Sequence, residues 1–271
     1  MAAMILTSYG YIDDSGFGGR DGVRPWDRNQ GEISRALRWR LTSAPPHERF
    51  GRMDLLSKYV SVAVEMLGLP PPPADGLHLS SAVVLGTAWG CQGVDGAFYQ
   101  GIVKGDGPSP TLFAYTLPTI AVGEVCIRHG LGGPSYCFQA GSDSGLVALF
   151  EGLRLLQEGE CERCLCIMAD AWSGEIASRG DKVLSGVGPR INYAYAFLLE
   201  QGQLAPAQEA LAVLTLRPAP TVPAPAEVRD SRQEGAKLLE ILQAADPDRR
   251  QTLDIPAPGA YGLSEVLTVS T

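Results

Sequence analysis

The chain has 271 residues, of which 45% are hydrophobic and 19% are charged, and its formal net charge at pH 7 is −8. This composition excludes a disordered chain, and the negative charge argues against nucleic acid or an anionic membrane as the main partner. No apolar run reaches the roughly 18 residues that a membrane-spanning helix needs, and we recognise no signal peptide. We therefore expect a cytoplasmic protein.

The first 70 residues predict a strand, a long irregular segment and one amphipathic helix. Residues 4–11 form an apolar strand, and residues 12–50 are irregular, with turn-forming Gly and Asp at 13–19. From Arg52 apolar residues recur at helical spacing, and the prolines at 70–73 end the helix. Its apolar stripe consists of Leu56, Tyr59, Val60, Ala63, Met66 and Leu67.

The next segment predicts a buried strand, a turn and a helix. Residues 81–86 are nearly all apolar, which is typical of a strand covered on both faces of a mostly parallel sheet. They lead into the turn Thr87-Ala88-Trp89-Gly90, and a helix then runs to about residue 103.

A strand–turn–helix pattern over residues 133–149 organises the rest of the chain. It begins with a Gly-Pro turn, continues as a short apolar run and breaks at the Gly-Ser-Asp-Ser-Gly sequence of residues 141–145. Apolar residues then recur at helical spacing as far as Leu156. Ser142 stands at the apex, so the pattern predicts the geometry of a nucleophile elbow. Glycines are needed there because no Cβ fits where strand and helix crowd together.

The residues beyond the elbow predict two more buried strands and a short terminal unit. Residues 163–170 form an apolar strand, residues 173–190 are loop-like, and residues 191–199 alternate at the period of a strand. The terminal unit comprises an edge strand at 211–216, a stiff Pro-rich linker at 218–225, a helix at 233–245 and a strand at 265–269.

The six cysteines, at positions 91, 126, 137, 161, 164 and 166, are better explained as free thiols than as metal ligands. Residues 161–166 contain one C-x-x-C, with no second pair and no histidine nearby. Cys164 and Cys166 occupy alternate positions of an apolar run, so we expect both on one face of a buried strand and no bound metal.

The elbow resembles the active-site segment of the β-ketoacyl-ACP synthases, which have the thiolase fold. Residues 133–149 read GPSYCFQAGSDSGLVAL, and the family's typical form, GPS-x-x-x-x-TACSSSLVAL, aligns without a gap. Three further segments resemble the family. The helix from Arg52 resembles RMSRF-x-x-YA-x-x-A, and the turn at 87–91 resembles GT-x-x-GG. Residues 109–131 resemble SPFFIP-x-TLPNMAAGHISIRYGL.

This resemblance covers most of residues 1–200 and implies a fold class. We expect a thiolase-like, three-layer α/β/α fold with a mixed, mostly parallel sheet, limited to the N-terminal half of the family's fold. Residues 1–200 would form the ketosynthase-like domain, and residues 201–271 would complete or flank it. A half-length chain would expose an edge strand and also the face meant for a second half.

The departure at the apex is the most informative difference, because Ser142 stands where the family keeps its acyl-accepting cysteine. A hydroxyl needs an adjacent base, whereas the resemblance implies that the family's two histidines belong to the second half. The histidines of this chain, His47, His78 and His129, all precede the elbow. Asp143 would oppose stabilisation of an anion beside Ser142. We therefore expect no catalytic residue.

Six residues are candidates for lining an acyl tunnel or an interface. The resemblance places Trp89 at a pocket-lining position and places Leu112 and Phe113 where aromatic residues gate the tunnel, although the residues alone favour a core role equally. The full set is Trp89, Leu112, Phe113, Thr116, Cys137 and Gln139.

The favoured function is that of a catalytically inactive subunit, similar to the chain-length factors that pair with an active ketosynthase in polyketide and aryl polyene biosynthesis. Expected partners are a full-length ketosynthase and an acyl carrier protein, with no cofactor, nucleic acid or membrane. Two alternatives stay open: a Ser142-dependent acyltransferase or esterase, and a homodimer that binds an acyl ligand.

Overall fold

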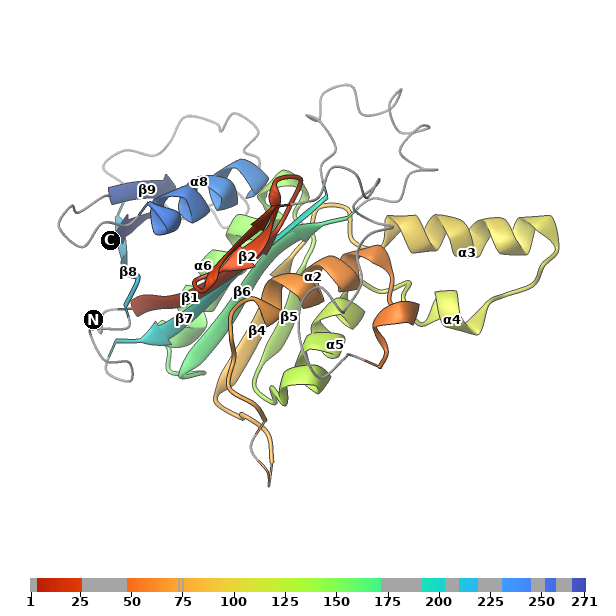
Figure 1. Ribbon diagram of the computed structural model, residues 1–271, viewed down its shortest axis with the longest axis horizontal. Coiled ribbons are helices and arrows are strands. Elements are labelled where there is room, and N and C mark those ends of the chain that lie inside the picture. Colours follow the sequence, from red (N-terminus) through yellow and green to blue (C-terminus); the bar gives the residue numbers. More distant parts are fainter. Residues whose placement is uncertain are drawn as a thin grey trace.

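Figure 1 shows a twisted sheet packed with helices, and a helical arm that extends away from it. The computed structural model describes residues 4–25, 48–72, 74, 76–171, 192–202, 210–218, 231–244, 252–256 and 265–271. The strands are β1 (Met4–Ile12), β2 (Gly16–Gly19), β3 (Gly22–Pro25), β4 (Ser81–Gly86), β5 (Ser135–Phe138), β6 (Arg163–Asp170), β7 (Tyr193–Gln201), β8 (Ala212–Pro218), β9 (Thr252–Pro256) and β10 (Glu265–Ser270). The helices are α2 (Leu55–Glu65), α3 (Gln92–Lys104), α4 (Pro110–Phe113), α5 (Thr119–His129), α6 (Ser144–Gln157) and α8 (Ser231–Gln243), with 3-10 turns η3 (Phe50–Arg52) and η4 (Gly141–Asp143).

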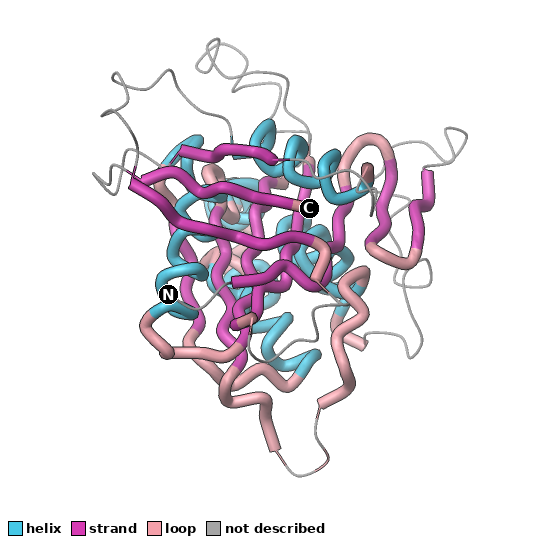
Figure 2. The backbone as a smooth tube through the Cα atoms, turned by 90° about the vertical axis from the view of Figure 1, so that its left-hand side faces the viewer, coloured by secondary structure: helices cyan, strands magenta, loops and turns pink. Residues whose placement is uncertain are grey.

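The sheet is mixed, and its parallel neighbours lie at one end. Its main path has the order β5-β4-β6-β7-β1-β8-β10-β9, and the hairpin β2–β3 pairs onto β1. β4 is parallel to both β5 and β6, whereas the other neighbours on the path are antiparallel. Because two antiparallel steps restore a direction, β1 and β10 point the same way as β5, β4 and β6, which makes five of the eight strands on the path. Figure 2 shows the sheet from the end with the C-terminal strands.

The two faces of the sheet carry separate hydrophobic clusters, which confirms the predicted three layers. Along β4, Ala82 and Val84 belong to the cluster with α6 and α8, whereas Val83 and Leu85 belong to the cluster with α2 and α5. β6 and β7 alternate in the same way, because successive side chains of a strand point to opposite faces. Cys164 and Cys166 lie on the α6 side with their sulfur atoms 3.7 Å apart, as predicted.

The helix after the elbow is covered by the C-terminal segment. Twelve of the fourteen residues of α6 are buried. The side chains that complete this cluster come from α8 and the terminal strands, and they include Leu238, Leu239, Leu242, Ile255, Leu267 and Val269. Both faces of the sheet are therefore covered by the described residues, and the prediction of an open face for a second half is wrong.

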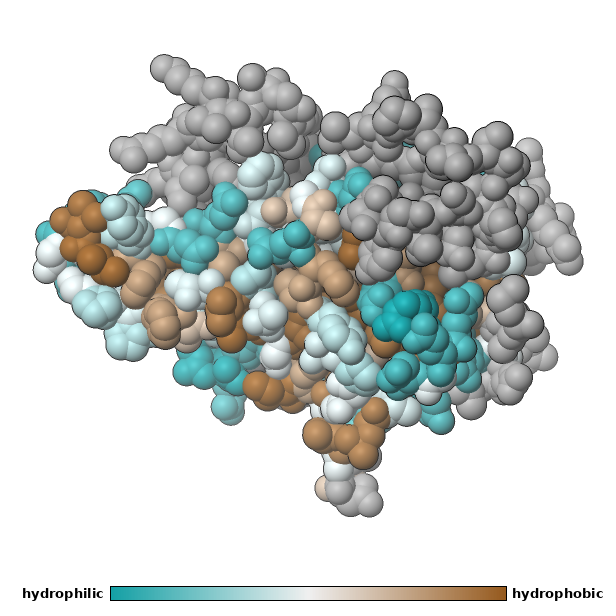
Figure 3. Space-filling model, turned by 180° about the vertical axis from the view of Figure 1, so that it is seen from behind, coloured by the Kyte–Doolittle hydropathy of each residue, from teal (hydrophilic) through white to brown (hydrophobic). Residues whose placement is uncertain are grey.

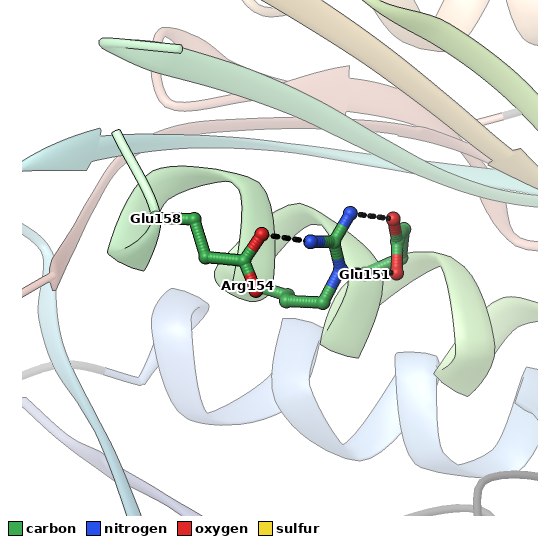
Figure 4. A network of polar contacts seen from close by, with 3 residues as sticks. All are labelled: Glu151, Arg154 and Glu158. Carbon is green, nitrogen blue, oxygen red and sulfur yellow. Dashed lines mark hydrogen bonds and ion pairs between the residues drawn. The ribbon is translucent and has the colours of Figure 1, made fainter. Parts of the chain in front are cut away.

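The partly exposed side of α6 carries a short charged network (Figure 4). Arg154 donates to Glu151, with Nη2 2.6 Å from Oε1, and also to Glu158 one turn further on. These carboxylates raise the pKa of the guanidinium above its ordinary value. Such neighbours on a helix contribute only about 0.2–0.5 kcal/mol per pair, so burial of the opposite side of α6 holds the helix in place.

Several element boundaries differ from the sequence predictions. The apolar run before the elbow was predicted to form a buried strand over residues 135–141, and this is wrong in length and in burial. β5 ends at Phe138, ahead of the 3-10 turn that Gly141 starts with a left-handed φ of +65°, and its residues are exposed or half-buried at the edge of the sheet. The hairpin β2–β3 lies inside the segment predicted to be irregular, and β9 was not predicted. The strand expected at an edge, β8, lies between β1 and β10.

Other predictions lie outside the described residues or stay untested. The loop-like segment at 173–190, most of the linker at 218–225 and His47 are not among the described residues. The division at residue 200 stays a prediction, although β8, β10 and β9 continue the same sheet as β1. Among the described residues, no helix has the length and apolar character needed to cross a bilayer.

Candidate functional site

The predicted elbow lies at the edge of the sheet, between β5 and α6. β5 ends at Phe138, η4 forms the turn, and α6 begins at Ser144, so Ser142 stands half-buried at the apex. The turn packs closely on the end of β4, since a Cβ at Gly86 would lie 1.9 Å from the carbonyl oxygen of Ser144. Glycine at position 86 is therefore required for this strand–turn–helix geometry.

Ser144 stabilises the turn by two hydrogen bonds of its side chain. Its hydroxyl accepts a hydrogen bond from the backbone N–H of Ala140 at 2.8 Å and donates to the carbonyl oxygen of Gly141 at 2.6 Å. The side chain is buried. This serine therefore has a structural role, which leaves Ser142 as the hydroxyl at the apex.

The two described histidines lie at the opposite end of β5 from Ser142. His78 forms a parallel bridge with Leu131, which precedes β5, and the backbone N–H of His78 donates to the carbonyl of Gly130. His129 ends α5 and lies 3.7 Å from Glu65. Since β5 and its flanking residues separate both imidazoles from the apex, neither is placed to act as a base for Ser142.

The cysteines near the elbow are unsuited to replace the missing thiolate. Cys137 is half-buried in β5, and burial raises the pKa of its thiol to about 11. Burial, followed by the charge of Asp95, raises the pKa of Cys91 to about 12. Both side chains are therefore protonated at neutral pH, and the thiolate is the nucleophilic form.

A carboxylate that the sequence analysis did not single out organises the turn next to the elbow. Asp170 ends β6, and one of its oxygens, Oδ1, accepts from the hydroxyl of Thr87 and from the backbone N–H groups of Ala88 and Trp89, at 2.8, 2.9 and 3.0 Å. Its other oxygen accepts from the hydroxyl of Tyr193 at 3.1 Å. The only feature of the sequence that could have pointed to Asp170 was its position, as a polar residue directly at the end of a buried strand.

Burial raises the pKa of Asp170, although its four hydrogen-bond donors act in the opposite direction. A carboxyl whose pKa is higher in the folded state than in the unfolded state stabilises the fold most below its unfolded pKa, and this stability is lost as the pH rises through the folded pKa. Asp170→Asn removes the ionisation and keeps an oxygen acceptor. We expect Asp170→Asn to unfold at a higher temperature than the wild type at pH 8, by about 2–4 °C for each kcal/mol gained.

Differential scanning calorimetry at pH 8, 6.5 and 5 tests this expectation. The advantage of Asp170→Asn should shrink as the pH falls, because the wild-type carboxyl then takes up a proton. If the wild type is at least as stable as Asp170→Asn at pH 8, the expectation is contradicted.

The six candidate tunnel or interface residues fall into two groups. Trp89 is half-buried beside the elbow, where a Cβ on Gly90 would lie 2.6 Å from Nε2 of the exposed Gln139. Cys137 belongs to the same neighbourhood through β5. The other three lie on or after α4: Leu112 is half-buried, Phe113 is 64% exposed, and Thr116 donates to the carbonyl of Phe113 at 2.8 Å.

The α3–α4 arm presents apolar side chains to solvent, and these lie on the left in Figure 3. None of the thirteen residues of α3 and none of the four residues of α4 is buried. Phe98 packs against Phe113 with ring centroids 5.7 Å apart. The exposed apolar side chains of the arm, the helix α5 and β5 are Tyr99, Ile102, Val103, Phe113, Leu117, Ile127 and Tyr136.

A cavity of about 420 Å³ lies at the base of α4. Arg49, Arg52 and Tyr115 are among its lining residues. Tyr115 donates to the buried Glu124 at 2.8 Å, and burial together with this carboxylate raises the pKa of Tyr115 to about 12. None of the six tunnel candidates lines this cavity.

These features define a class: an α/β/α protein of the thiolase type, with an elbow at the carboxyl end of an edge strand and a hydroxyl at its apex. Residues 47–181 match the family model "Beta-ketoacyl synthase, N-terminal domain". The chain is therefore a β-ketoacyl synthase N-terminal-domain-like protein, which confirms the family predicted from the elbow.

Solved structures of known proteins share the fold. A chain of the ishigamide ketosynthase/chain length factor is 19% identical, with a TM-score of 0.68, over 99% of this chain and 98% of that chain. A chain from a ketosynthase in complex with its chain length factor, from Xenorhabdus doucetiae, is 19% identical, with a TM-score of 0.61 and all of both chains covered. A β-ketoacyl synthase from Burkholderia phymatum is 17% identical, with a TM-score of 0.57, over 80% of this chain and 65% of that chain. No curated protein sequence matches this chain.

Proposed function

We propose that this chain is a catalytically inactive ketosynthase-like subunit. It pairs with a full-length ketosynthase and shapes the acyl tunnel of that enzyme in biosynthesis of the fatty acid, polyketide or aryl-polyene type. The observation that carries this proposal is the exposed edge strand β5, which lies beside an arm of unburied apolar side chains.

The backbone of β5 has hydrogen-bonding groups that point away from the sheet. Val83 N–H donates to the carbonyl of Pro134, and Thr87 N–H donates to the carbonyl of Phe138, so alternate residues of β5 face β4. The intervening residues, Ser135 and Cys137, direct their N–H and C=O groups outward. An edge of this kind is a template for pairing with another strand.

The α3–α4 arm supplies the second part of the interface. An isolated helix of thirteen residues is marginal in water, and α3 contains Gly93, Gly96 and Gly101, each of which costs about 1 kcal/mol relative to Ala. Packing must therefore stabilise α3, and within the described part of the chain every residue of this helix stays at least partly exposed. A partner that covers Tyr99, Ile102 and Val103 would supply that packing.

A ketosynthase is the partner that best fits this surface. The chain shares its fold with proteins whose structures are named as complexes of a ketosynthase and a chain length factor, and it matches their chains over nearly their whole length. Phe113 is 64% exposed on the arm and does not line the cavity at the base of α4, which fits a side chain that reaches a partner's tunnel. We further propose that the pair receives its substrates from an acyl carrier protein.

The geometry of the elbow supports the proposed inactivity. The apex carries a hydroxyl, the neighbouring thiols are protonated, and the described histidines lie at the far end of β5. A hydroxyl nucleophile requires a base within hydrogen-bond reach.

Co-expression with a full-length ketosynthase from the same organism tests the pairing. We expect one heterodimer on gel filtration with light scattering, and condensation products of defined length once an acyl carrier protein and extender units are added. A symmetric dimer of this chain that ignores the ketosynthase would favour the acyl-binding homodimer instead.

The proposed inactivity makes a prediction that separates it from the Ser142-dependent alternative. Ser142→Cys should leave the chain unable to decarboxylate malonyl-carrier protein or to condense acyl groups, because the substitution supplies the thiol without its base. The measurement is product formation by mass spectrometry, with Ser142→Ala as the matched control.

Turnover by Ser142→Cys above the Ser142→Ala background would contradict inactivity. Labelling of the wild type, but not of Ser142→Ala, by a serine-reactive phosphonate would favour the acyltransferase or esterase.

A further inference from the structure

Asp170 lies where three segments of the fold meet. Its carboxylate receives hydrogen bonds from the 87–89 segment after β4 and from Tyr193 at the start of β7, and Asp170 itself ends β6. The bond to the backbone N–H of Trp89 spans 81 residues of sequence. A single half-buried side chain therefore joins the carboxyl ends of the neighbouring strands β4 and β6 to the start of β7 and to the turn that precedes α3.

Thr87 extends this network toward the elbow. Its hydroxyl donates to Asp170 and accepts from the backbone N–H of Gly90 at 2.9 Å, so the N–H groups of residues 88, 89 and 90 all bind either Asp170 or Thr87. The backbone N–H of Thr87 donates to the carbonyl of Phe138, the last residue of β5. The turn that carries Trp89 is therefore tied to the elbow as well as to β6.

Close packing also restricts the turn at residues 87–90 on the side that faces Gln139 and Pro118. Gly90 has a left-handed φ of +58°, and a Cβ there would lie 2.6 Å from Nε2 of Gln139 and 3.1 Å from Cγ of Pro118. With its backbone bound by Asp170 and its surface covered by Gln139, the turn holds the Trp89 backbone in one place.

We propose that Asp170 is a positioning residue that fixes Trp89, and that through Trp89 it sets the acyl length accepted by the heterodimer. The second half of this proposal rests on the proposed function, whereas the first half concerns this chain alone. Asp170 touches no substrate; it acts by fixing the backbone of the residue that does.

The first half is tested on the purified chain by ¹⁹F NMR with 5-fluorotryptophan. The chain has four tryptophans, and the Trp89 signal is assigned by its loss in Trp89→Phe. Asp170→Ala should move or broaden the Trp89 signal, whereas Asp170→Asn, which keeps the oxygen acceptor, should restore it close to the wild-type position. Thr87→Val, which removes one hydroxyl from the same network without changing the shape of the side chain, should also perturb the signal.

Tyr193→Phe is the matched control, because it removes the bond to the other carboxylate oxygen and leaves the bonds to Ala88 and Trp89. Its Trp89 signal should stay unchanged. If Asp170→Ala does not fold, Thr87→Val and Asp170→Asn decide the question. An unperturbed Trp89 signal in Thr87→Val, or in a folded Asp170→Ala, would overturn the positioning role.

The second half is tested in the reconstituted heterodimer by the length distribution of the products. Asp170→Ala, or Thr87→Val if that variant does not fold, should lengthen the products in the same direction as Trp89→Ala. The double variant should match Trp89→Ala alone, since the network acts only through Trp89. Additive lengthening in the double variant, or unchanged length with a displaced Trp89 signal, would overturn the link to chain length. Failure of the wild type to form a heterodimer would instead remove the proposed function and leave the NMR result to decide the positioning role.

Discussion

We expect Cys137→Pro to abolish the proposed heterodimer, whereas Cys137→Ala should leave it intact. The Cys137 N–H points away from β4, so proline removes a donor that the sheet of this chain does not use and places a ring on the pairing edge. Losing one interchain hydrogen bond and leaving its acceptor buried costs about 1–3 kcal/mol, and the ring disturbs the neighbouring bonds as well. We expect the dissociation constant to rise at least about a hundredfold, measured by isothermal titration calorimetry against the ketosynthase.

Cys137→Ala is the matched variant because it keeps the backbone donor and loses only a small half-buried side chain. Circular dichroism of both variants must first show the wild-type fold. Equal affinity of the proline and alanine variants would show that β5 does not pair with the partner, and the interface would then have to lie elsewhere.

We expect Trp89→Ala to lengthen the products of the reconstituted pair and to leave the first condensation nearly unchanged. In the proposed heterodimer the indole closes the acyl tunnel, so each added two-carbon unit must displace or bend it. Overpacking a filled pocket costs about 1–3 kcal/mol, which changes the favoured length by a factor of roughly ten or more per step. The measurement is liquid chromatography with mass spectrometry of the products at equal heterodimer concentration.

Phe113→Ala gives a second and independent measure of the same tunnel. Phe113 is 64% exposed on the arm and its ring packs against that of Phe98, so its removal should affect product length with little loss of stability of this chain. Tyr193→Phe serves as a control, because it changes the Asp170 network without removing the bonds to Ala88 and Trp89, so the product length should stay that of the wild type. Products of unchanged length in both alanine variants would contradict the chain-length role while leaving the heterodimer itself untouched.

The sequence by itself determined the elements whose burial pattern is periodic. The strands at β4, β6 and β7 alternate between two clusters, and α6 carries its apolar stripe from Leu146 to Leu156, so local spacing was sufficient to predict them. The elbow was equally visible, because Gly-Pro before the strand marks a turn and the glycines at 141 and 145 interrupt the apolar run, with Gly141 allowing the left-handed conformation that starts the turn. The same residues predicted Ser142 at the apex, and the resemblance to the β-ketoacyl-ACP synthases implied a thiol at that position.

Only the tertiary structure decided how the C-terminal segment is used. The spacing in β8 and α8 predicts a strand and a helix but carries no information about their neighbours, and the structure places β8 beside β1 and α8 beside α6. That placement closes a face that was expected to stay open. The pairing of β2 with β1 depends in the same way on partners that local pattern cannot identify.

The Asp170 network shows why the candidate site was only partly predictable. Its bonds to Thr87, Ala88 and Trp89 join residues 81 to 83 positions apart, and no periodic pattern links them. The parallel pairing of β4 with β6 brings the carboxyl ends of both strands to one edge, where Asp170 reaches the turn. Residue types fixed which groups could form hydrogen bonds, and the order of the strands decided which of them meet.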